Sequence, residues 1–112
     1  MKGNKLFIIA SLVLLCCTML SCNTETTVYG TIARSGGDPV PNLKVSLEYG
    51  DYAFGFTPVY SAITGSDGLY EITFDYNLDD QRTYWIHLGE GAYSYNKVNI
   101  NRGKMNRFDY VY

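Results

Sequence analysis

The sequence is poor in the residues that build disulfide frameworks and metal centres. Its three cysteines all lie within the first 22 residues, so the chain beyond Cys22 has no disulfide and no thiolate ligand. It has one histidine, His87, which excludes from this chain any site that needs two or more histidines. A domain of this composition has to be stabilised by its hydrophobic core.

Basic residues are also few. Apart from Lys2 and Lys5 at the N-terminus, the chain has seven basic residues against eleven acidic ones, a net charge of −4. A small domain with this charge has no electrostatic basis for binding nucleic acid or anionic lipid headgroups. Any attachment to a membrane is therefore expected to come from a covalent lipid.

The N-terminal segment has the layout of a secretory signal. A short basic region precedes the apolar run Leu6–Leu20, which is shorter than the roughly 20 apolar residues of a transmembrane helix. The run ends at Ser21-Cys22, and this ending resembles the lipobox of bacterial lipoproteins. Met19 and Leu20 depart from that pattern, which prefers leucine and then a small residue at these two positions.

The lipobox resemblance implies that residues 1–21 are a lipoprotein signal peptide. Cys22 is then the lipidation site, carries palmitate and becomes the mature N-terminus. Residues 22–27 are expected to form a polar tether, and residues 28–112 the folded domain. The alternative is a plain secretory signal, or an uncleaved anchor, that happens to contain cysteines.

Beyond the signal the sequence shows no helical periodicity. It consists of short alternating segments separated by turn residues, at intervals of about ten residues, which is typical of a β-sandwich. The expected fold is all-β, a seven-stranded Greek-key β-sandwich. The seven expected strands are Val28–Ala33, Leu43–Tyr49, Val59–Thr64, Leu69–Phe74, Arg82–Leu88, Tyr93–Ile100 and Met105–Val111.

Two turns are expected to close hairpins. Asp67-Gly68 supplies a positive-φ residue between the third and fourth strands, and Gly103 within Asn101–Lys104 supplies one between the last two. The stretch Gly50–Pro58 contains alternating aromatics among glycines, and we expect it to be a loop or an irregular edge.

The alternation along Leu43–Tyr49 is the clearest in the chain. It predicts that Leu43, Val45, Leu47 and Tyr49 point into the core, and that Lys44, Ser46 and Glu48 point outward. In the fifth strand the same parity places Tyr84, Ile86 and Leu88 on one face, with Trp85 and His87 on the other.

Two separated motifs, the first within residues 28–47 and the second within residues 64–72, resemble the carboxypeptidase regulatory-like domain, which has a transthyretin-like (prealbumin-like) β-sandwich fold. The resemblance implies an accessory or binding module of a bacterial cell-envelope lipoprotein. It covers about half of the expected mature chain. The matching residues are Val28-x-Gly30-Thr-Ile32, Gly37-Asp-Pro39-Val-Pro41-Asn-x-x-Val45-x-Leu47 and Thr64-x-x-Asp67-Gly68-x-Tyr70-x-Ile72.

Enzymes with similar sandwiches need residues that this chain lacks. Hydroxyisourate hydrolases require several histidines and arginines and a C-terminal Tyr-Arg-Gly-Ser, whereas this chain ends Phe108-Asp-Tyr-Val-Tyr112. Intradiol dioxygenases hold iron with two tyrosines and two histidines. Collagen-adhesin repeats cross-link a buried lysine, whereas Lys44 is expected to point outward. We therefore expect no enzymatic activity.

The aromatic stretch Tyr49–Tyr60 is the candidate ligand-binding site. Tyr52, Phe54 and Phe56, with glycines around them, are the kind of residues that stack on a glycan or anchor a peptide. The competing interpretation is that these three rings close one end of the core.

Two other candidates are weaker. His87 lies on the non-core face of its strand, and nothing nearby marks a nucleophile, so we expect a surface or cross-strand histidine. Asp75–Asp80 copies the first ligands of a calcium loop but has Asp80 at the glycine position and Ile86 at the position of the bidentate glutamate. A solvated acidic turn is expected, and a non-standard calcium site in this loop is the alternative.

The sequence thus predicts a non-enzymatic, lipid-anchored binding module of the cell envelope that recognises a protein or a glycan. It would be an outer-membrane lipoprotein, periplasmic or surface-facing, without cofactor, metal or nucleic-acid partner. The alternative is a structural or assembly subunit that pairs through sheet edges, with Met105–Tyr112 as the expected free edge.

Overall fold

The computed structural model describes residues 24–91 and 94–112, which form eight β-strands and no helix. This part of the chain therefore contains no helix that could span a membrane. The predicted signal peptide and Cys22 lie outside the described residues. The strands are β1 (Glu25–Ala33), β2 (Lys44–Asp51), β3 (Gly55–Ile63), β4 (Leu69–Asp75), β5 (Tyr84–Leu88), β6 (Tyr95–Val98), β7 (Met105–Arg107) and β8 (Tyr110–Val111).

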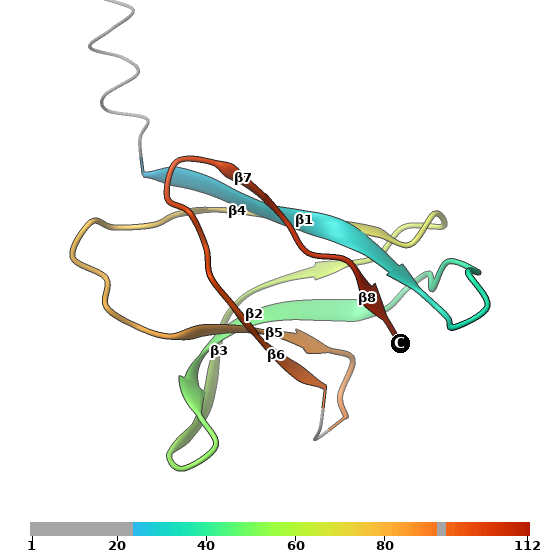
Figure 1. Ribbon diagram of the computed structural model, residues 1–112, viewed down its shortest axis with the longest axis horizontal. Helices are drawn as coiled ribbons and strands as arrows, with labels where there is room; N and C mark the ends of the chain where they lie inside the picture. Colours follow the sequence, from blue (N-terminus) through green and yellow to red (C-terminus); the bar gives the residue numbers. More distant parts are fainter. Residues whose placement is uncertain (1–23, 92–93) are drawn as a thin grey trace, which may run out of the picture.

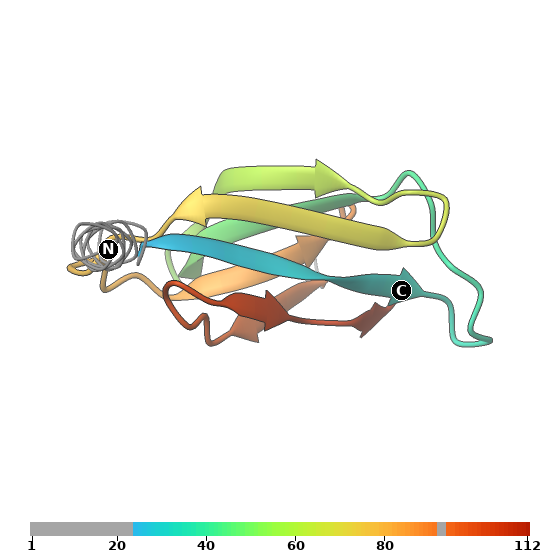
Figure 2. The same ribbon diagram turned by 90° about the horizontal axis from the view of Figure 1, so that it is seen from above.

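The strands form two sheets that face each other, as Figures 1 and 2 show from two directions. One sheet has the order β4-β1-β7, with β8 also paired to β1, and the other has the order β3-β2-β5-β6. β1 is antiparallel to β4 and parallel to β7 and β8. The prediction of an all-β fold is confirmed, and the strands are arranged in two layers.

The structure has one strand more than expected because the predicted strand Met105–Val111 is divided into β7 and β8. At the division, the Asp109 carboxylate accepts a hydrogen bond from the backbone N–H of Thr31 at 2.8 Å, where a strand would offer a carbonyl. The Phe108 N–H still donates to Tyr29 O at 2.8 Å. Met105–Tyr112 lies at an edge of its sheet, as expected, since among the described strands β7 and β8 pair only with β1. The edge is not one long strand, because it is interrupted at Asp109.

The prediction that two of the turns close hairpins is wrong. β3 and β4, on either side of Asp67-Gly68, lie in different sheets, and so do β6 and β7. Gly68 and Gly103 do have positive φ values, 77° and 73°. A glycine of this kind fixes where the chain turns, but the next strand can either pair with the previous one or cross to the facing sheet. Both connections here cross.

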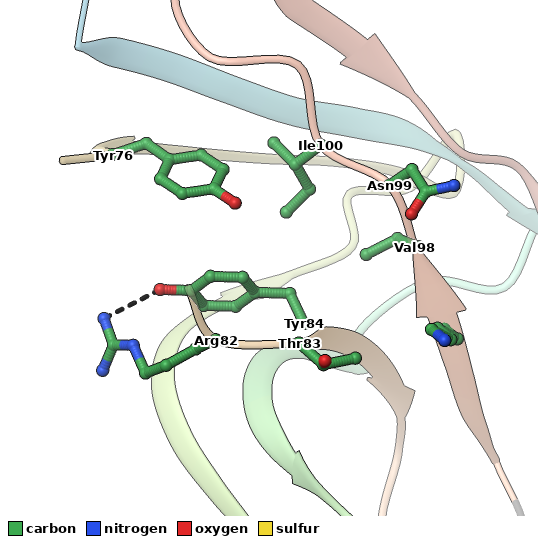
Figure 3. Close-up of a pocket in the computed structure, with 8 residues that line it drawn as sticks. Tyr76, Arg82, Thr83, Tyr84, Val98, Asn99 and Ile100 are labelled. Carbon is green, nitrogen blue, oxygen red and sulfur yellow. Dashed lines mark hydrogen bonds between the residues drawn. The ribbon is translucent and has the colours of Figure 1, made fainter. Parts of the chain in front are cut away.

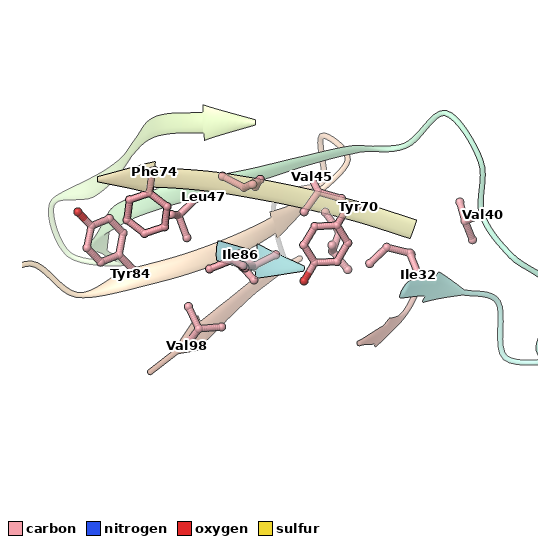
Figure 4. Close-up of a cluster of buried hydrophobic side chains, with 12 residues drawn as sticks. Ile32, Val40, Val45, Leu47, Tyr70, Phe74, Tyr84, Ile86 and Val98 are labelled. Carbon is pink, nitrogen blue, oxygen red and sulfur yellow. The ribbon is translucent and has the colours of Figure 1, made fainter. Parts of the chain in front are cut away.

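The core lies between the sheets, and Figure 4 shows its side chains converging from both layers. The inward faces predicted for the second and fifth strands are confirmed, with Val45, Leu47 and Ile86 fully buried. Twelve hydrophobic residues make up this core, namely Val28, Ile32, Val40, Val45, Leu47, Tyr70, Ile72, Phe74, Tyr84, Ile86, Leu88 and Val98.

The turn before β4 is tied to the loop that follows β1. The buried Thr64 hydroxyl donates to Val40 O at 2.6 Å and accepts from Leu43 N at 2.9 Å. Gly68 O accepts from Ile32 N at 2.9 Å, and a Cβ on Gly68 would collide with the Ile32 carbonyl. Threonine and glycine are thus required at these positions to join the two motifs that are separated in the sequence.

β1 begins earlier than expected. Glu25, Thr26 and Thr27, which were assigned to the tether, belong to the strand and pair with β4. Thr26 is fully buried, and its hydroxyl accepts from Gly103 N at 2.9 Å. Because these residues are polar and lack a long apolar alternation, the pattern alone did not place them in a sheet.

β3 also begins earlier than expected, at Gly55, so that Gly55–Pro58 is strand rather than loop. The expected irregularity is present as a β-bulge, where the β2–β3 register shifts between Leu47 and Glu48. Lys44 is exposed, as the parity predicts, but Ser46 and Glu48 are buried, at 3% and 5% exposure. Some feature must therefore cover the outward face of this sheet.

Candidate functional site

The outer face of the β3-β2-β5-β6 sheet, turned away from the core, is covered by a second group of side chains. Cross-strand partners point to the same side of a sheet. Trp85 on β5 is opposite Glu48 on β2, and His87 is opposite Tyr95 on β6. These four side chains share the outer face, because their neighbours in sequence point into the core.

Five rings form what we call the aromatic cluster: Tyr52, Phe56, Trp85, His87 and Tyr95. His87 stacks on Tyr95, with ring centroids 4.1 Å apart and planes at 8°, and Tyr95 stacks on Phe56 at 3.9 Å and 11°. Phe56 and Tyr95 come from the two edge strands, so their rings meet over the central strands β2 and β5. This cover explains why Ser46 and Glu48 are buried on the outward face.

Glu48 forms an ion pair with His87, one of the stacked rings. His87 Nδ1 is 2.9 Å from Glu48 Oε2, and His87 Nε2 is 2.8 Å from Gly91 O. Both partners are acceptors, so an imidazolium that donates from both nitrogens satisfies the geometry. His87 Nε2 faces the Gly91 carbonyl rather than the hydroxyl of a nucleophile. His87 is therefore a cross-strand residue, as the sequence predicted, and it contacts Glu48 and Tyr95 on the outer face.

Tyr52 is held rigidly and yet exposed. Its ring meets those of Phe56, Trp85 and Tyr95 nearly at right angles, with centroid distances of 5.1, 5.5 and 6.2 Å. Its side chain nevertheless remains 64% exposed. Edge-to-face contacts of this kind are favourable, so the Tyr52 ring is presented to solvent in a fixed orientation.

Phe54 stands at the tip of the β2–β3 hairpin and is 93% exposed. The Asp51 carboxylate accepts from the N–H groups of Ala53 and Phe54 at 2.9 and 2.7 Å, which fixes the turn. The interpretation that Tyr52, Phe54 and Phe56 close the core is wrong, because the first two are exposed and Phe56 packs on the outer face.

Gly50 is the point at which β2 makes room for the aromatic cluster. Its carbonyl accepts from Trp85 Nε1 at 2.8 Å. Its φ is 135°, and a Cβ would collide with the Gly55 carbonyl across the hairpin. A larger residue would therefore disturb both the hairpin and the position of the indole.

The Tyr95 hydroxyl stays protonated well above neutral pH. Burial raises its pKa, and the charges of Glu48 and the Tyr52 hydroxyl raise it further. A neutral phenol can both donate and accept a hydrogen bond. The outer face thus combines apolar ring surface with hydroxyl groups.

A shallow groove of about 160 Å³ lies on the same sheet, over β2 and β3. It offers a lysine ammonium, two serine hydroxyls and one tyrosine ring. Its lining residues are Lys44, Ser46, Pro58, Val59, Tyr60 and Ser61.

A larger pocket, about 320 Å³, lies at one end of the sandwich (Figure 3). Its wall includes Tyr76, Arg82 and Tyr84. Arg82 Nη2 donates to Asp80 at 2.9 Å and to the Tyr84 hydroxyl at 2.8 Å. Arg82 is therefore already paired with a carboxylate, and the second cation that lines the pocket is Lys97.

The contacts of Arg82 and Tyr84 also involve Asp80, the last residue of the acidic loop Asp75–Asp80. Hydrogen bonds from Arg82, and then from Tyr84, hold the pKa of Asp80 well below its usual range although its partial burial opposes this. Among residues 24–91 and 94–112, no three histidine, cysteine, aspartate or glutamate side chains are grouped so as to hold a metal ion.

The sequence did not identify Glu48, Trp85 and Tyr95 as members of the site. The parity of the fifth strand did place Trp85 and His87 together on the non-core face. A tryptophan exposed on one face, close in space to an aromatic hairpin, was the signal that could have found them. Tyr95 gave no signal, because its ring reaches Phe56 across two intervening strands.

The fold and this face define an all-β domain of two packed sheets with aromatic side chains gathered on one outer surface. No family model matches the sequence, and no curated protein matches it. Among solved structures, the chain is similar to a 9R-lipoxygenase from Cyanothece PCC8801, with 14% identity and a TM-score of 0.53. The match covers 80% of this chain but 16% of the lipoxygenase, so the likeness concerns the fold of a small part of that protein.

Proposed function

We propose that this protein is a non-enzymatic binding module of the cell envelope that recognises a glycan through the aromatic cluster. The observation that carries the proposal is the state of Tyr52. Its ring is fixed by three other rings and is 64% exposed. A ring that is already ordered loses little conformational entropy when a ligand stacks on it.

The size and chemistry of the site favour a glycan over a protein ligand. A stable protein interface buries roughly 800 Å² on each partner around an apolar centre. Here the strongly exposed rings are Tyr52 and Phe54, and the rest of the cluster is half-buried. A single fixed ring beside hydroxyl groups suits the alternating apolar and polar faces of a sugar.

The attachment to the envelope rests on the sequence. The apolar run Leu6–Leu20 and Ser21-Cys22 support a lipoprotein signal peptide, with lipidation at Cys22 and an outer-membrane location. The chain enters the described domain at Thr24, directly after this segment. Replacing Cys22 by Ser and fractionating the cells tests it, since a variant that stays in the membrane fraction would refute lipidation there.

The finer fold assignment, a transthyretin-like sandwich with Greek-key connections, is part of the same proposal. It is supported by the way the two family-like motifs meet. Thr64 and Gly68 of the second motif bond to Val40 and Ile32 of the first. Two of the connections, β3 to β4 and β6 to β7, cross between the sheets.

A glycan array tests the proposed function. The wild-type domain is expected to bind a defined set of glycans, and Tyr52→Ala is expected to lose them while unfolding at the same temperature. Retained binding by a folded Tyr52→Ala would refute the role of this face. Capture of a protein with no glycan binding would favour the protein ligand instead.

One observation favours the alternative of an assembly subunit. Among the described strands, β3 and β6 in one sheet and β4, β7 and β8 in the other each pair with a single strand, so each presents a free edge. Tyr60 and Ile63 on β3 are exposed, but Pro58 within this strand removes one backbone donor. Light scattering at increasing concentration distinguishes the two functions, since an assembly subunit forms larger species without a glycan.

A further inference from the structure

The outer face that bears the aromatic cluster carries two exposed lysines although the domain is acidic. The chain from Cys22 onward has a net charge of −4. On this face, however, the alternation of β2 places Lys44, and the pairing with Trp85 places Lys97. Two carboxylates of β2 lie close to the cluster: Glu48 is buried and bound to His87, and the exposed Asp51 accepts from the N–H groups of Ala53 and Phe54 in the hairpin.

Both lysines are available to a ligand. Lys44 and Lys97 are exposed, and neither makes an ion pair within the described part of the chain. By contrast, Arg82 and Arg107 are each paired with an aspartate. Free cations next to a preformed stacking surface are the groups that recognise an anion on the ligand.

The two lysines lie on different sides of the cluster. Lys97 is directly opposite Trp85 across the β5–β6 pair. Lys44 precedes Glu48 by four residues along β2, a distance of about 13 Å at the rise of a strand. The groove with the Ser46 and Ser61 hydroxyls is also lined by Lys44. A ligand that reaches from the rings to the groove therefore meets Lys97 beside the rings, and Lys44 with the exposed Ser61 hydroxyl in the groove.

We propose that the ligand of this face is an acidic oligosaccharide that carries uronate carboxylates. One sugar ring stacks on Tyr52, and carboxylates of neighbouring units pair with Lys44 and Lys97. The exposed Ser61 hydroxyl bonds to the sugar in the groove. This inference rests on the proposed glycan-binding function and specifies the charge and the reach of the ligand.

The test uses a matched pair of ligands. Oligogalacturonate trimers carry a carboxylate on each unit, and in their methyl esters each carboxylate is replaced by an uncharged methyl ester of nearly the same shape. Trp85 is the single tryptophan of the chain and lies in the aromatic cluster, so its fluorescence reports binding directly. The variants are Lys44→Gln, Lys97→Gln, Tyr52→Ala and the control Lys104→Gln, an exposed lysine next to β7 of the other sheet.

The acidic trimer is expected to bind more tightly than its ester and to weaken as salt is added. Lys44→Gln and Lys97→Gln should each reduce affinity for the acid about two- to fivefold, the size of an exposed ion pair. Neither should change affinity for the ester, and Lys104→Gln should change neither affinity.

Equal affinity for acid and ester, or equal effects of all three lysine variants, would overturn the acidic ligand. If Tyr52→Ala still abolished binding of the ester in that case, the proposed glycan function would stand. Binding of neither trimer would also overturn the acidic ligand, and the array with Tyr52→Ala would then decide the proposed function by itself.

Discussion

Glu48 on β2 and His87 on β5 are diagonal neighbours, and they form an ion pair of 2.9 Å on the outward side of the sheet. The pair is covered, because the His87 ring stacks on Tyr95 and the Glu48 side chain is 6% exposed. An outward glutamate in an alternating strand is normally solvated. Its burial here shows that the domain builds a second packed layer over this sheet.

The first prediction concerns this ion pair. His87→Ala removes the partner of a buried carboxylate and the stacking surface of Tyr95, and should lower the free energy of unfolding by about 3 kcal/mol. The double variant Glu48→Gln/His87→Gln leaves no charge unpaired, so it should lower the free energy of unfolding by clearly less than His87→Ala does. Urea unfolding of both variants measures the difference. A single variant that is no less stable than the double one would contradict the account.

The second prediction concerns the turn before β4. Gly68→Ala forces an L-residue into a φ of 77° and drives its Cβ into the Ile32 carbonyl, so it should destabilise the fold by more than about 1 kcal/mol. Gly36→Ala is the matched control. Nothing lies within 4 Å of a Cβ at Gly36, and this variant should be nearly neutral in thermal unfolding.

The third prediction concerns alkaline pH. Burial raises the pKa of Tyr110 to about 12, whereas an unfolded tyrosine titrates near 10. Between these values the folded state holds a proton that the unfolded state has lost, so stability falls as the pH rises from about 10 to about 12. Tyr110→Phe should show a smaller fall in urea midpoint over this range. An identical fall in both proteins would rule out Tyr110 as a source.

The core and the two-layer architecture could be predicted because they depend on local alternation. Val45, Leu47 and Ile86 are buried where the pattern placed them. The hairpins could not be predicted, because Gly68 specifies a turn whichever sheet the next strand joins. The partner of a strand depends on contacts between distant segments, such as the bond from Ile32 N to Gly68 O.

Part of the candidate site could be predicted from local sequence. Tyr52 and Phe56 were identified by their local composition, and they do belong to the aromatic cluster. Tyr95 and Glu48 were not, because their roles arise from a meeting of edge strands over the sheet. An argument from periodicity shows which face of the sheet a side chain is on. It does not show whether another residue covers that side chain.

The fourth prediction separates a fixed ring from an exposed one. Tyr52 and Phe54 lie in the same hairpin and are both exposed, but of the two it is Tyr52 that packs against the rings of the cluster. If ordering of the ring before binding matters, Tyr52→Ala should lose far more affinity than Phe54→Ala. Neither change should alter stability by as much as Phe56→Ala, which removes the stacking partner of Tyr95.

The most direct test is a calorimetric titration of the best glycan from the array into wild type, Tyr52→Ala and Phe54→Ala. The account predicts that Tyr52→Ala weakens binding more than about tenfold, as expected for a central aromatic contact. Phe54→Ala should stay within about twofold of the wild type. A Tyr52→Ala domain that binds as tightly as wild type would contradict the account.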